Sequence, residues 1–279
     1  METAKLALGI AIFWPILVIP LFVLFKQKRA AKLILAIVKT VIPLLALLVL
    51  DYFYWNSQLV IELWKFSFSI SKFSLAIASI ISFSSFFIMF YNLGHKYTGN
   101  VPFDIFMCLL ISSLIGGIFG NDLITTYIFL DLALFSGGYL IFSLKKSARI
   151  AYLYVFSNLI GSILILTSIV LYSSQTGSYL LQSINASGLL LFGFLVGLMI
   201  KAAIVPLHIW APESYAKSPI PVAALLAGNT NALVLFTSFR ILKLFSCQTF
   251  LQLFGAITLI YAAVLALSSS DLRKMAAYI

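Results

Sequence analysis

The sequence predicts an all-α, polytopic membrane protein, and three observations lead to this fold class. Hydrophobic residues make up 62% of the 279 residues and charged residues only 9%, against roughly 45–50% and about 25% in an ordinary soluble domain. The mean hydropathy is +1.11. Apolar runs of about 20 residues, the length of a membrane-spanning helix, recur along the whole chain. So few charged groups exclude a soluble enzyme, and so high an apolar content excludes a disordered chain.

About nine apolar runs are long enough to cross a bilayer. In chain order they are Ala4–Phe25, Leu33–Trp55, Phe73–Asn92, Pro102–Gly120, Asp122–Leu144, Arg149–Ser173, Ala186–Trp210, Pro221–Lys243 and Gln248–Ser268. We expect residues 271–279 to form a cytoplasmic tail or the first turns of a further helix. This order divides the chain into three leading helices over 1–100, five helices over 101–245, and a ninth helix with the tail over 246–279.

The segment between the second and third spans, Asn56–Lys72, is too polar to cross a membrane. Within it, Phe66-Ser67-Phe68-Ser69-Ile70-Ser71 alternates apolar and polar residues with a period of two. That period is typical of a strand rather than a helix. We therefore predict a short hairpin at the membrane interface.

The basic residues set the predicted orientation, because cytoplasmic loops carry an excess of Lys and Arg. If nine helices alternate, one side carries Lys26, Lys28, Arg29, Lys32, Lys96, Lys145, Lys146, Arg149, Lys217, Arg273 and Lys274, and the other side carries Lys5, Lys65, Lys72, Arg240 and Lys243. The N-terminus is therefore expected outside and the C-terminus inside an energy-transducing membrane, such as a bacterial or archaeal cell membrane. The net charge of +10 is explained by these loops, so no nucleic-acid partner is expected.

Six ionisable residues lie inside the apolar spans, where a charge costs about 2.5–3.5 kcal/mol at the bilayer centre. They are Lys39, Asp51, Asp104, Asp131, Lys201 and Arg240. Asp51 and Arg240 lie near span ends, within reach of the interface, and Asp104 suits the positive end of its helix. For Lys39 two interpretations stay open, a side chain that extends to the basic first loop and a functional charge.

Asp131 and Lys201 are the least expected of these charges. Asp131 is nine residues into the fifth span, or roughly 14 Å along a helix axis, and Lys201 is near the middle of the seventh. An acid and a base at such depth are typical of a proton route. The alternative is a structural ion pair that ties two helices together.

The seventh span also contains a helix breaker. Pro206 has no amide hydrogen, so the helix is expected to be interrupted just after Lys201. Interrupted helices in membranes line cavities or ion sites, and His208 and Glu213 follow the break. In the next span, Gly228–Asn231 is a small and polar stretch that faces either a wet interior or a neighbouring helix.

A longer motif surrounds the break. It runs Lys201-Ala-Ala-Ile-Val-Pro206-Leu-His208-Ile-Trp210-Ala-Pro212-Glu213, followed by Ser218-Pro219-Ile-Pro221-Val-Ala-Ala-Leu-Leu. This motif resembles the antiporter-like, proton-translocating membrane subunits of respiratory complex I, Mrp-type cation/proton antiporters and membrane-bound hydrogenases. The resemblance extends over about 66–279 and includes the stretch Asp271-Leu-Arg-Lys-Met-Ala-Ala-Tyr278.

The resemblance implies that an acid on the fifth helix and a lysine on the broken seventh helix gate proton movement. Mapped onto this chain, those residues are Asp131 and Lys201. We therefore predict an ion-translocation site whose residues are Asp131, Lys201, Pro206, His208 and Asn231, with Lys39, Arg240 and Glu213 as secondary candidates.

The chain departs from the family pattern in ways that bear on its function. The family has about fourteen helices in two inverted repeats, whereas this chain covers the first repeat. Asn231 and Ala227 stand where the eighth helix of relatives commonly has Lys or His, and Asp131 replaces the usual Glu. Two functions stay open: a proton or sodium half-channel that other subunits complete, and a non-transporting paralogue that links and seals a membrane arm.

No cofactor and no catalytic residue are expected in this chain. Its two cysteines, Cys108 and Cys247, lack metal-binding spacing, and its two histidines, His95 and His208, do not suggest a haem. A nucleotide-binding fingerprint is absent as well. The expected partners are other membrane subunits, including full-length antiporter-like paralogues, together with a peripheral redox module if the complex carries one.

Overall fold

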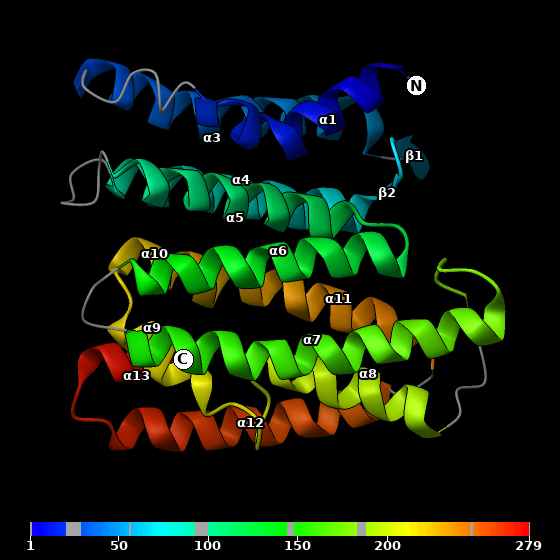
Figure 1. Cartoon of the computed structure of the whole chain (residues 1–279), viewed down its shortest axis with the longest axis vertical. Coiled ribbons are helices and arrows are strands. Elements are labelled where there is room, and N and C mark those ends of the chain that lie inside the picture. Colours follow the sequence, from blue (N-terminus) through cyan, green and yellow to red (C-terminus); the bar gives the residue numbers. More distant parts are fainter. Residues whose placement is uncertain are drawn as a thin grey trace. The chain divides into compact units, whose positions relative to one another are not determined.

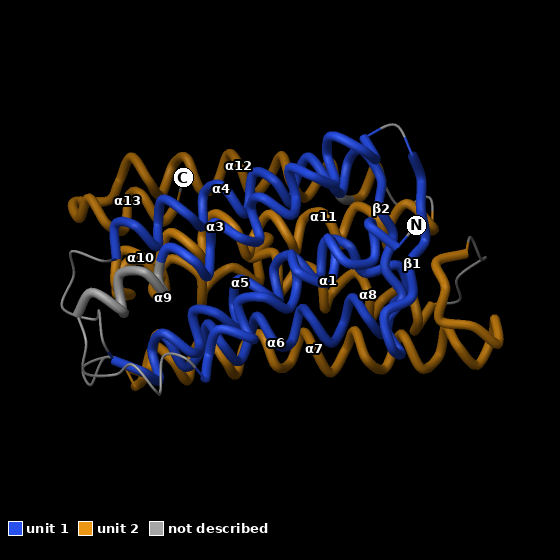
Figure 2. Tube along the Cα trace, turned by 90° about the horizontal axis from the view of Figure 1, so that it is seen from above, with its two compact units in different colours: residues 1–140 blue, residues 141–279 orange. Residues whose placement is uncertain are grey.

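The computed structural model describes residues 2–20, 29–55, 57–92, 100–143, 148–182, 188–245 and 248–278. Most of them are helical, which confirms the predicted all-α fold class (Figure 1). The chain divides into two compact units, Met1–Leu140 and Ile141–Ile279, which Figure 2 distinguishes by colour.

Unit 1 is a helical bundle built around one central helix. Its helices are α1 (Glu2–Leu17), α3 (Arg29–Tyr54), α4 (Lys72–Asn92), α5 (Val101–Phe119) and α6 (Leu123–Phe142), the last of which ends just beyond the unit. Both α1 and α4 pack against α3 and against α5. Of the apolar window of α5, 72% is buried, the largest share among the candidate spans, so this helix forms the core of the unit.

The predicted hairpin is present in unit 1. Strands β1 (Leu59–Leu63) and β2 (Phe66–Ile70) pair antiparallel, with Leu59 opposite Ile70. The backbone N–H of Asn121 donates to the carbonyl of Ser67 at 2.8 Å, and Phe68 is fully buried. The hairpin is thereby joined to the turn between α5 and α6.

Unit 2 consists of two long packed helices, a broken segment and a C-terminal pair. Its elements are α7 (Ala148–Thr176), α8 (Gly188–Lys201), α9 (Trp210–Lys217), α10 (Ile220–Ala224), the π-helix η1 (Leu225–Thr230), α11 (Asn231–Lys243), α12 (Gln248–Ser268) and α13 (Leu272–Tyr278). Helices α7 and α8 approach closely at glycines. A Cβ on Gly197 would lie 2.8 Å from the carbonyl oxygen of Gly161, so small residues permit this contact.

Within the described residues, six helices are long and apolar enough to cross a membrane. They are Ile37–Tyr54, Lys72–Asn92, Val101–Phe119, Leu123–Phe142, Ala148–Thr176 and Ile220–Lys243. These six confirm six of the predicted spans. The predicted seventh span, Ala186–Trp210, contains α8 and ends at the first residue of α9, and the predicted ninth corresponds to α12. The first predicted span begins as α1 and continues into residues 21–25, which lie outside the described residues.

Candidate functional site

The predicted interruption of the seventh span is confirmed, and a specific helix end produces it. The N–H of Ile204 donates to the carbonyl of Met199 at 2.9 Å, and the N–H of Ala203 to that of Ile200 at 3.2 Å. This pair of bonds is the Schellman motif, whose turning residue is left-handed. Ala203 is that residue, with φ of 53°. The turn ends α8 at Lys201, five residues before Pro206.

Trp210, the first residue of α9, connects the two helices on either side of the break. Its indole N–H donates to the carbonyl of Ile200 at 2.9 Å, which satisfies an acceptor at the end of α8. Its side chain is buried against Tyr154 and Tyr215, both in edge-to-face contact. Sequence reasoning gave Trp210 no role, although its place in the motif signalled one.

Lys201 is the last residue of α8 and is only 3% exposed. The carbonyl end of a helix carries a partial negative charge, which favours an ammonium group in the last turn. The end of α8 therefore supports a buried cation at a depth where a lysine is otherwise costly. The connection that begins with Ala202 follows directly.

A cavity of about 180 Å³, here called the inner cavity, adjoins this connection. Its lining includes Ala202, His208, Tyr215, Asn231 and Thr258. The structure thus brings together two predicted site residues, His208 and Asn231, which belong to different elements. The hydroxyl of Tyr215 lies 3.0 Å from the side-chain oxygen of Asn231 and donates to it.

His208 contributes an unsatisfied polar atom to this region. Its Nδ1 is buried and has no hydrogen-bond partner among the residues that the structure describes. The imidazole ring packs edge-to-face on Tyr261, with the ring centres 5.1 Å apart. Buried polar atoms of this kind are usually paired with protein or water, so Nδ1 favours water in the inner cavity.

The polar stretch Gly228–Asn231 spans the junction of η1 and α11. Asn231 is the first residue of α11, and Asn229 is buried on η1. A π-helical turn inside a longer helix is frequent at functional sites. Here it sets the position from which Asn231 reaches Tyr215.

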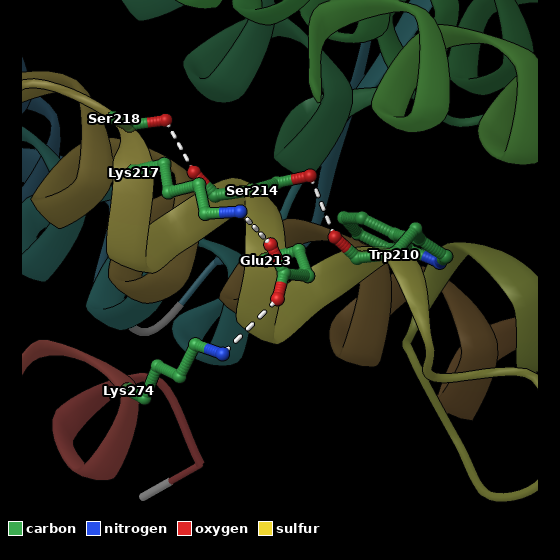
Figure 3. A network of polar contacts seen from close by, with 6 residues as sticks. All are labelled: Trp210, Glu213, Ser214, Lys217, Ser218 and Lys274. Atoms are coloured by element: carbon green, nitrogen blue, oxygen red, sulfur yellow. Dashed lines mark hydrogen bonds and ion pairs between the residues drawn. The ribbon is translucent and has the colours of Figure 1, made fainter. Parts of the chain in front are cut away.

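Glu213 lies on α9, outside the candidate spans, and forms a cluster of contacts that Figure 3 shows. Its carboxylate pairs with Lys217 on the same helix and with Lys274 of α13, the latter at 3.2 Å. Hydrogen bonds to these two ammonium groups lower the pKa of Glu213. Glu213 therefore joins α13 to α9 and is not part of the inner cavity lining.

Asp131 lies on α6 in unit 1, whereas Lys201 belongs to unit 2. The side chain of Tyr127, one helical turn earlier, is hydrogen-bonded to the Asp131 carboxylate. Arg240, the remaining secondary candidate, lies in the last turn of α11 with its guanidinium 5.5 Å from the Phe236 ring centre.

For Lys39, the structure bears on the first of the two open interpretations, a side chain that extends to the first loop. Its side chain does not extend to the first loop: it is 1% exposed, and its Nζ lies 3.2 Å from Oδ1 of Asp104. Asp104 therefore forms a buried ion pair with Lys39, in addition to its place at a helix end. Both residues lie toward the same end of parallel spans, and that opposite-charge arrangement was the signal available in the sequence. Asp51, expected near the interface, accepts a hydrogen bond from Ser79 at 2.7 Å.

Within the described parts of the chain, no group of three or more His, Cys, Asp or Glu side chains could hold a metal ion. His95 and Cys247 lie outside the described residues. The chemistry of the site is that of buried charges, amides and hydroxyls.

Comparison with known proteins identifies the family of this chain. The family model described as NADH:quinone oxidoreductase/Mrp antiporter, TM, matches residues 120–279. A Staphylococcus epidermidis protein named as antiporter subunit mnhD2 is 26% identical over 286 residues, which cover 92% of this chain and 57% of that relative. The chain thus spans little more than half the length of this curated relative.

Two solved structures share the fold. The Mrp complex from Dietzia sp. DQ12-45-1b matches with a TM-score of 0.88 and 19% identity, over 100% of this chain and 56% of that one. The archaeal membrane-bound sulfane sulfur reductase matches with a TM-score of 0.87 and 20% identity, over 98% and 49%. The predicted antiporter-like fold is thereby confirmed.

Proposed function

Because the chain belongs to the NADH:quinone oxidoreductase/Mrp antiporter family of transmembrane subunits, we propose that it contributes a half-channel for protons or sodium ions to a multi-subunit membrane complex. The observation that carries this proposal is the end of α8. A buried lysine, Lys201, stands where the helix stops, and the residues that follow line a cavity with His208 and Asn231.

Lys201 and Asp131 are the charges that move the ion in this proposal. Both lie within apolar helices, where a change of protonation alters the electrostatic energy of nearby groups strongly because the dielectric is low. Asp131 contributes a carboxylate on α6 of unit 1, and Lys201 contributes an ammonium group at the end of α8 of unit 2. Each of the two residues has a proton-carrying role in this proposal.

The half-channel requires partner subunits in this proposal. The relatives are described as an antiporter subunit and as parts of an Mrp complex and an archaeal respiratory membrane complex. We propose full-length antiporter-like subunits as neighbours, with a peripheral redox module where the complex is respiratory. The excess of basic residues in alternate loops supports an N-terminus outside and a C-terminus inside.

The test is ion-gradient formation by the assembled complex carrying Lys201→Arg. Arginine keeps the positive charge but does not release its proton in proteins. We expect transport to be lost while the complex still assembles, and Asp131→Asn to have the same effect. Lys217→Arg, on the exposed side of α9, is the matched control and should transport normally. Normal transport by both Lys201→Arg and Asp131→Asn would overturn the proposal.

The second candidate function is a scaffold that links and seals the membrane arm. One observation favours it: Asn231, at a position where relatives commonly have a titratable residue, cannot titrate and is bonded to Tyr215. A scaffold would tolerate Lys201→Arg and Asp131→Asn in transport assays but would fail to assemble when its packing is disturbed. The same experiment therefore separates the two functions.

A further inference from the structure

Two cavities in unit 2 share one wall. The inner cavity, of about 180 Å³, lies beside the break, and a second one of about 250 Å³, here called the outer cavity, lies between α9, α10 and α13. Four residues line both of them. They are Tyr215, Ala227, Ala276 and Ala277.

The outer cavity leads from the surface of unit 2 toward this wall. Arg273, Ile220 and Ala224 at its rim are exposed. Tyr215 and Ser218, which also line it, are 7% and 3% exposed. The cavity is thus open at one end and ends against the buried side chain of Tyr215.

Tyr215 is the only large side chain among the four wall residues, since the other three are alanines. Its hydroxyl is bonded to Asn231, which lines the inner cavity. This hydrogen bond and the edge-to-face contact with Trp210 hold the bulky part of the wall in place. A typical bond of this kind contributes little net free energy, so thermal motion can break it.

We propose that Tyr215 is a gate through which water passes between the outer and inner cavities. With its hydroxyl on Asn231 the gate is closed, and when the side chain turns away the two cavities join. Water then runs from the rim at Arg273 to His208 and to the residues that follow Lys201. This inference rests on the proposed function for the purpose of the gate, namely to deliver protons along that water.

The inner cavity suits water. Its volume of about 180 Å³ holds several molecules, since each occupies roughly 30 Å³ in the liquid. A buried water needs two to four polar partners, and the lining offers the Asn231 amide, the Thr258 hydroxyl and the imidazole of His208. The unsatisfied Nδ1 of His208 is the atom that such a water would pair with.

The wall is held together by the contact between α9 and α13. Ala276 and Ala277 belong to α13, and Lys274 on the same helix pairs with Glu213 of α9 at 3.2 Å. Figure 3 shows Glu213 at the centre of this contact, between Lys217 and Lys274. The ion pair thereby keeps the two alanines against the helix that carries Tyr215.

The experiment is cysteine accessibility in the assembled complex in membrane vesicles. The background carries Cys108→Ala and Cys247→Ala, and Ala262→Cys places a thiol in the inner cavity lining, away from the shared wall. The probe is the charged reagent trimethylammonium-ethyl methanethiosulfonate, added to the side that the outer cavity faces. We expect Tyr215→Ala to raise the labelling rate by more than about tenfold, because it removes the ring together with the hydrogen bond, and about tenfold corresponds to the loss of one such bond alone.

Two further variants keep the test decisive. Tyr215→Phe retains the ring and loses only the bond to Asn231, so it should raise the rate less than Tyr215→Ala and still fold. Ala227→Leu refills the shared wall and should return the rate of Tyr215→Ala to its starting value. Ala224→Cys, at the exposed rim of the outer cavity, is the control and should be labelled equally in every variant.

The result that overturns the gate is an equal labelling rate of Ala262→Cys with and without Tyr215. Labelling is measured without ion transport, so the two proposals can fail separately. If labelling follows Tyr215 but Lys201→Arg transports normally, the gate stands and the half-channel function fails. If Lys201→Arg is inactive and the labelling rate is the same with and without Tyr215, the gate alone is wrong.

Discussion

Two buried lysines, Lys39 in unit 1 and Lys201 in unit 2, are supported in different ways. Their exposed fractions are 1% and 3%. Lys39 lies inside the continuous helix α3 and meets the carboxylate of Asp104 at 3.2 Å. Lys201 is the last residue of α8, and the chain that follows it lines the inner cavity. The first arrangement pairs a charge with a carboxylate, whereas the second places a charge at a helix end that cavity-lining residues follow.

We expect the first charge to hold helices together and the second to take part in the proposed ion movement. A buried ion pair gains little net stability, because desolvation offsets the attraction, but removal of one partner leaves the other charge uncompensated. Lys39 and Asp104 should therefore matter chiefly for the stability of unit 1. Lys201 should matter chiefly for transport.

The largest expected effect follows from breaking the Lys39–Asp104 pair. Lys39→Met leaves the Asp104 carboxylate buried without its ion-pair partner and should lower the free energy of unfolding by about 3–5 kcal/mol. The measurement is denaturant unfolding of the purified protein in detergent. Lys65→Met, on the exposed turn of the hairpin, is the control and should change stability by less than about 0.5 kcal/mol.

A double variant sharpens this result. Lys39→Met combined with Asp104→Leu removes both charges and should recover most of the lost stability, because apolar replacement of a buried pair is often neutral. Transport by the double variant should persist, in contrast to Lys201→Met. Loss of transport in a stable double variant would instead make Lys39 part of the ion route.

The sequence predicts a feature well when neighbouring residues determine it, and poorly when the feature depends on residues far apart in the chain. The hairpin follows from the alternation in Phe66–Ser71, and the break is predicted from nearby Pro206, although the turn that ends α8 is at Ala203, so both are local features. The Lys39–Asp104 pair joins residues 65 positions apart and depends on how α3 and α5 are placed. The bond between Tyr215 and Asn231 depends on the π-helical turn of η1, for which the sequence has no comparable signal.

The next test concerns Trp210, which supports the helix end at Lys201. Trp210→Phe keeps an aromatic ring but removes the indole N–H that bonds the Ile200 carbonyl. The Ile200 carbonyl keeps the longer bond from the Ala203 N–H, so the expected cost is that of one lost hydrogen bond, about 0.5–1.5 kcal/mol, and both stability and transport should fall. Trp64→Phe is the control, since Trp64 is 94% exposed at the hairpin turn. Equal behaviour of the two variants would show that the indole does not support the break.

A smaller effect is expected at Ala203, the left-handed residue of the Schellman turn. Ala203→Gly removes the steric cost of φ at 53° and should stabilise the protein by up to about 1 kcal/mol. Ala202→Gly, one residue earlier, gains nothing of this kind and should be neutral or destabilising. Comparison of the two unfolding midpoints checks the geometry of the break directly.

The smallest effect concerns the contact between α9 and α13, where the charges are partly exposed. Lys217 and Lys274 lower the pKa of Glu213 below its ordinary value of 4.5. A carboxylate with a lowered pKa in the folded state contributes stability above its unfolded pKa, and this contribution disappears as the pH falls through the lower folded value. Its size is about 0.2–1 kcal/mol, because solvent and salt screen such pairs. Protection of the α13 amides, which is the slowing of exchange relative to the intrinsic rate at the same pH, should therefore be greatest near pH 7 and fall below about pH 4.5. Glu213→Gln should remove this pH dependence of protection. If protection in the Gln variant still falls in the same way, another group holds α13, and the alanines of the shared wall are positioned by packing alone.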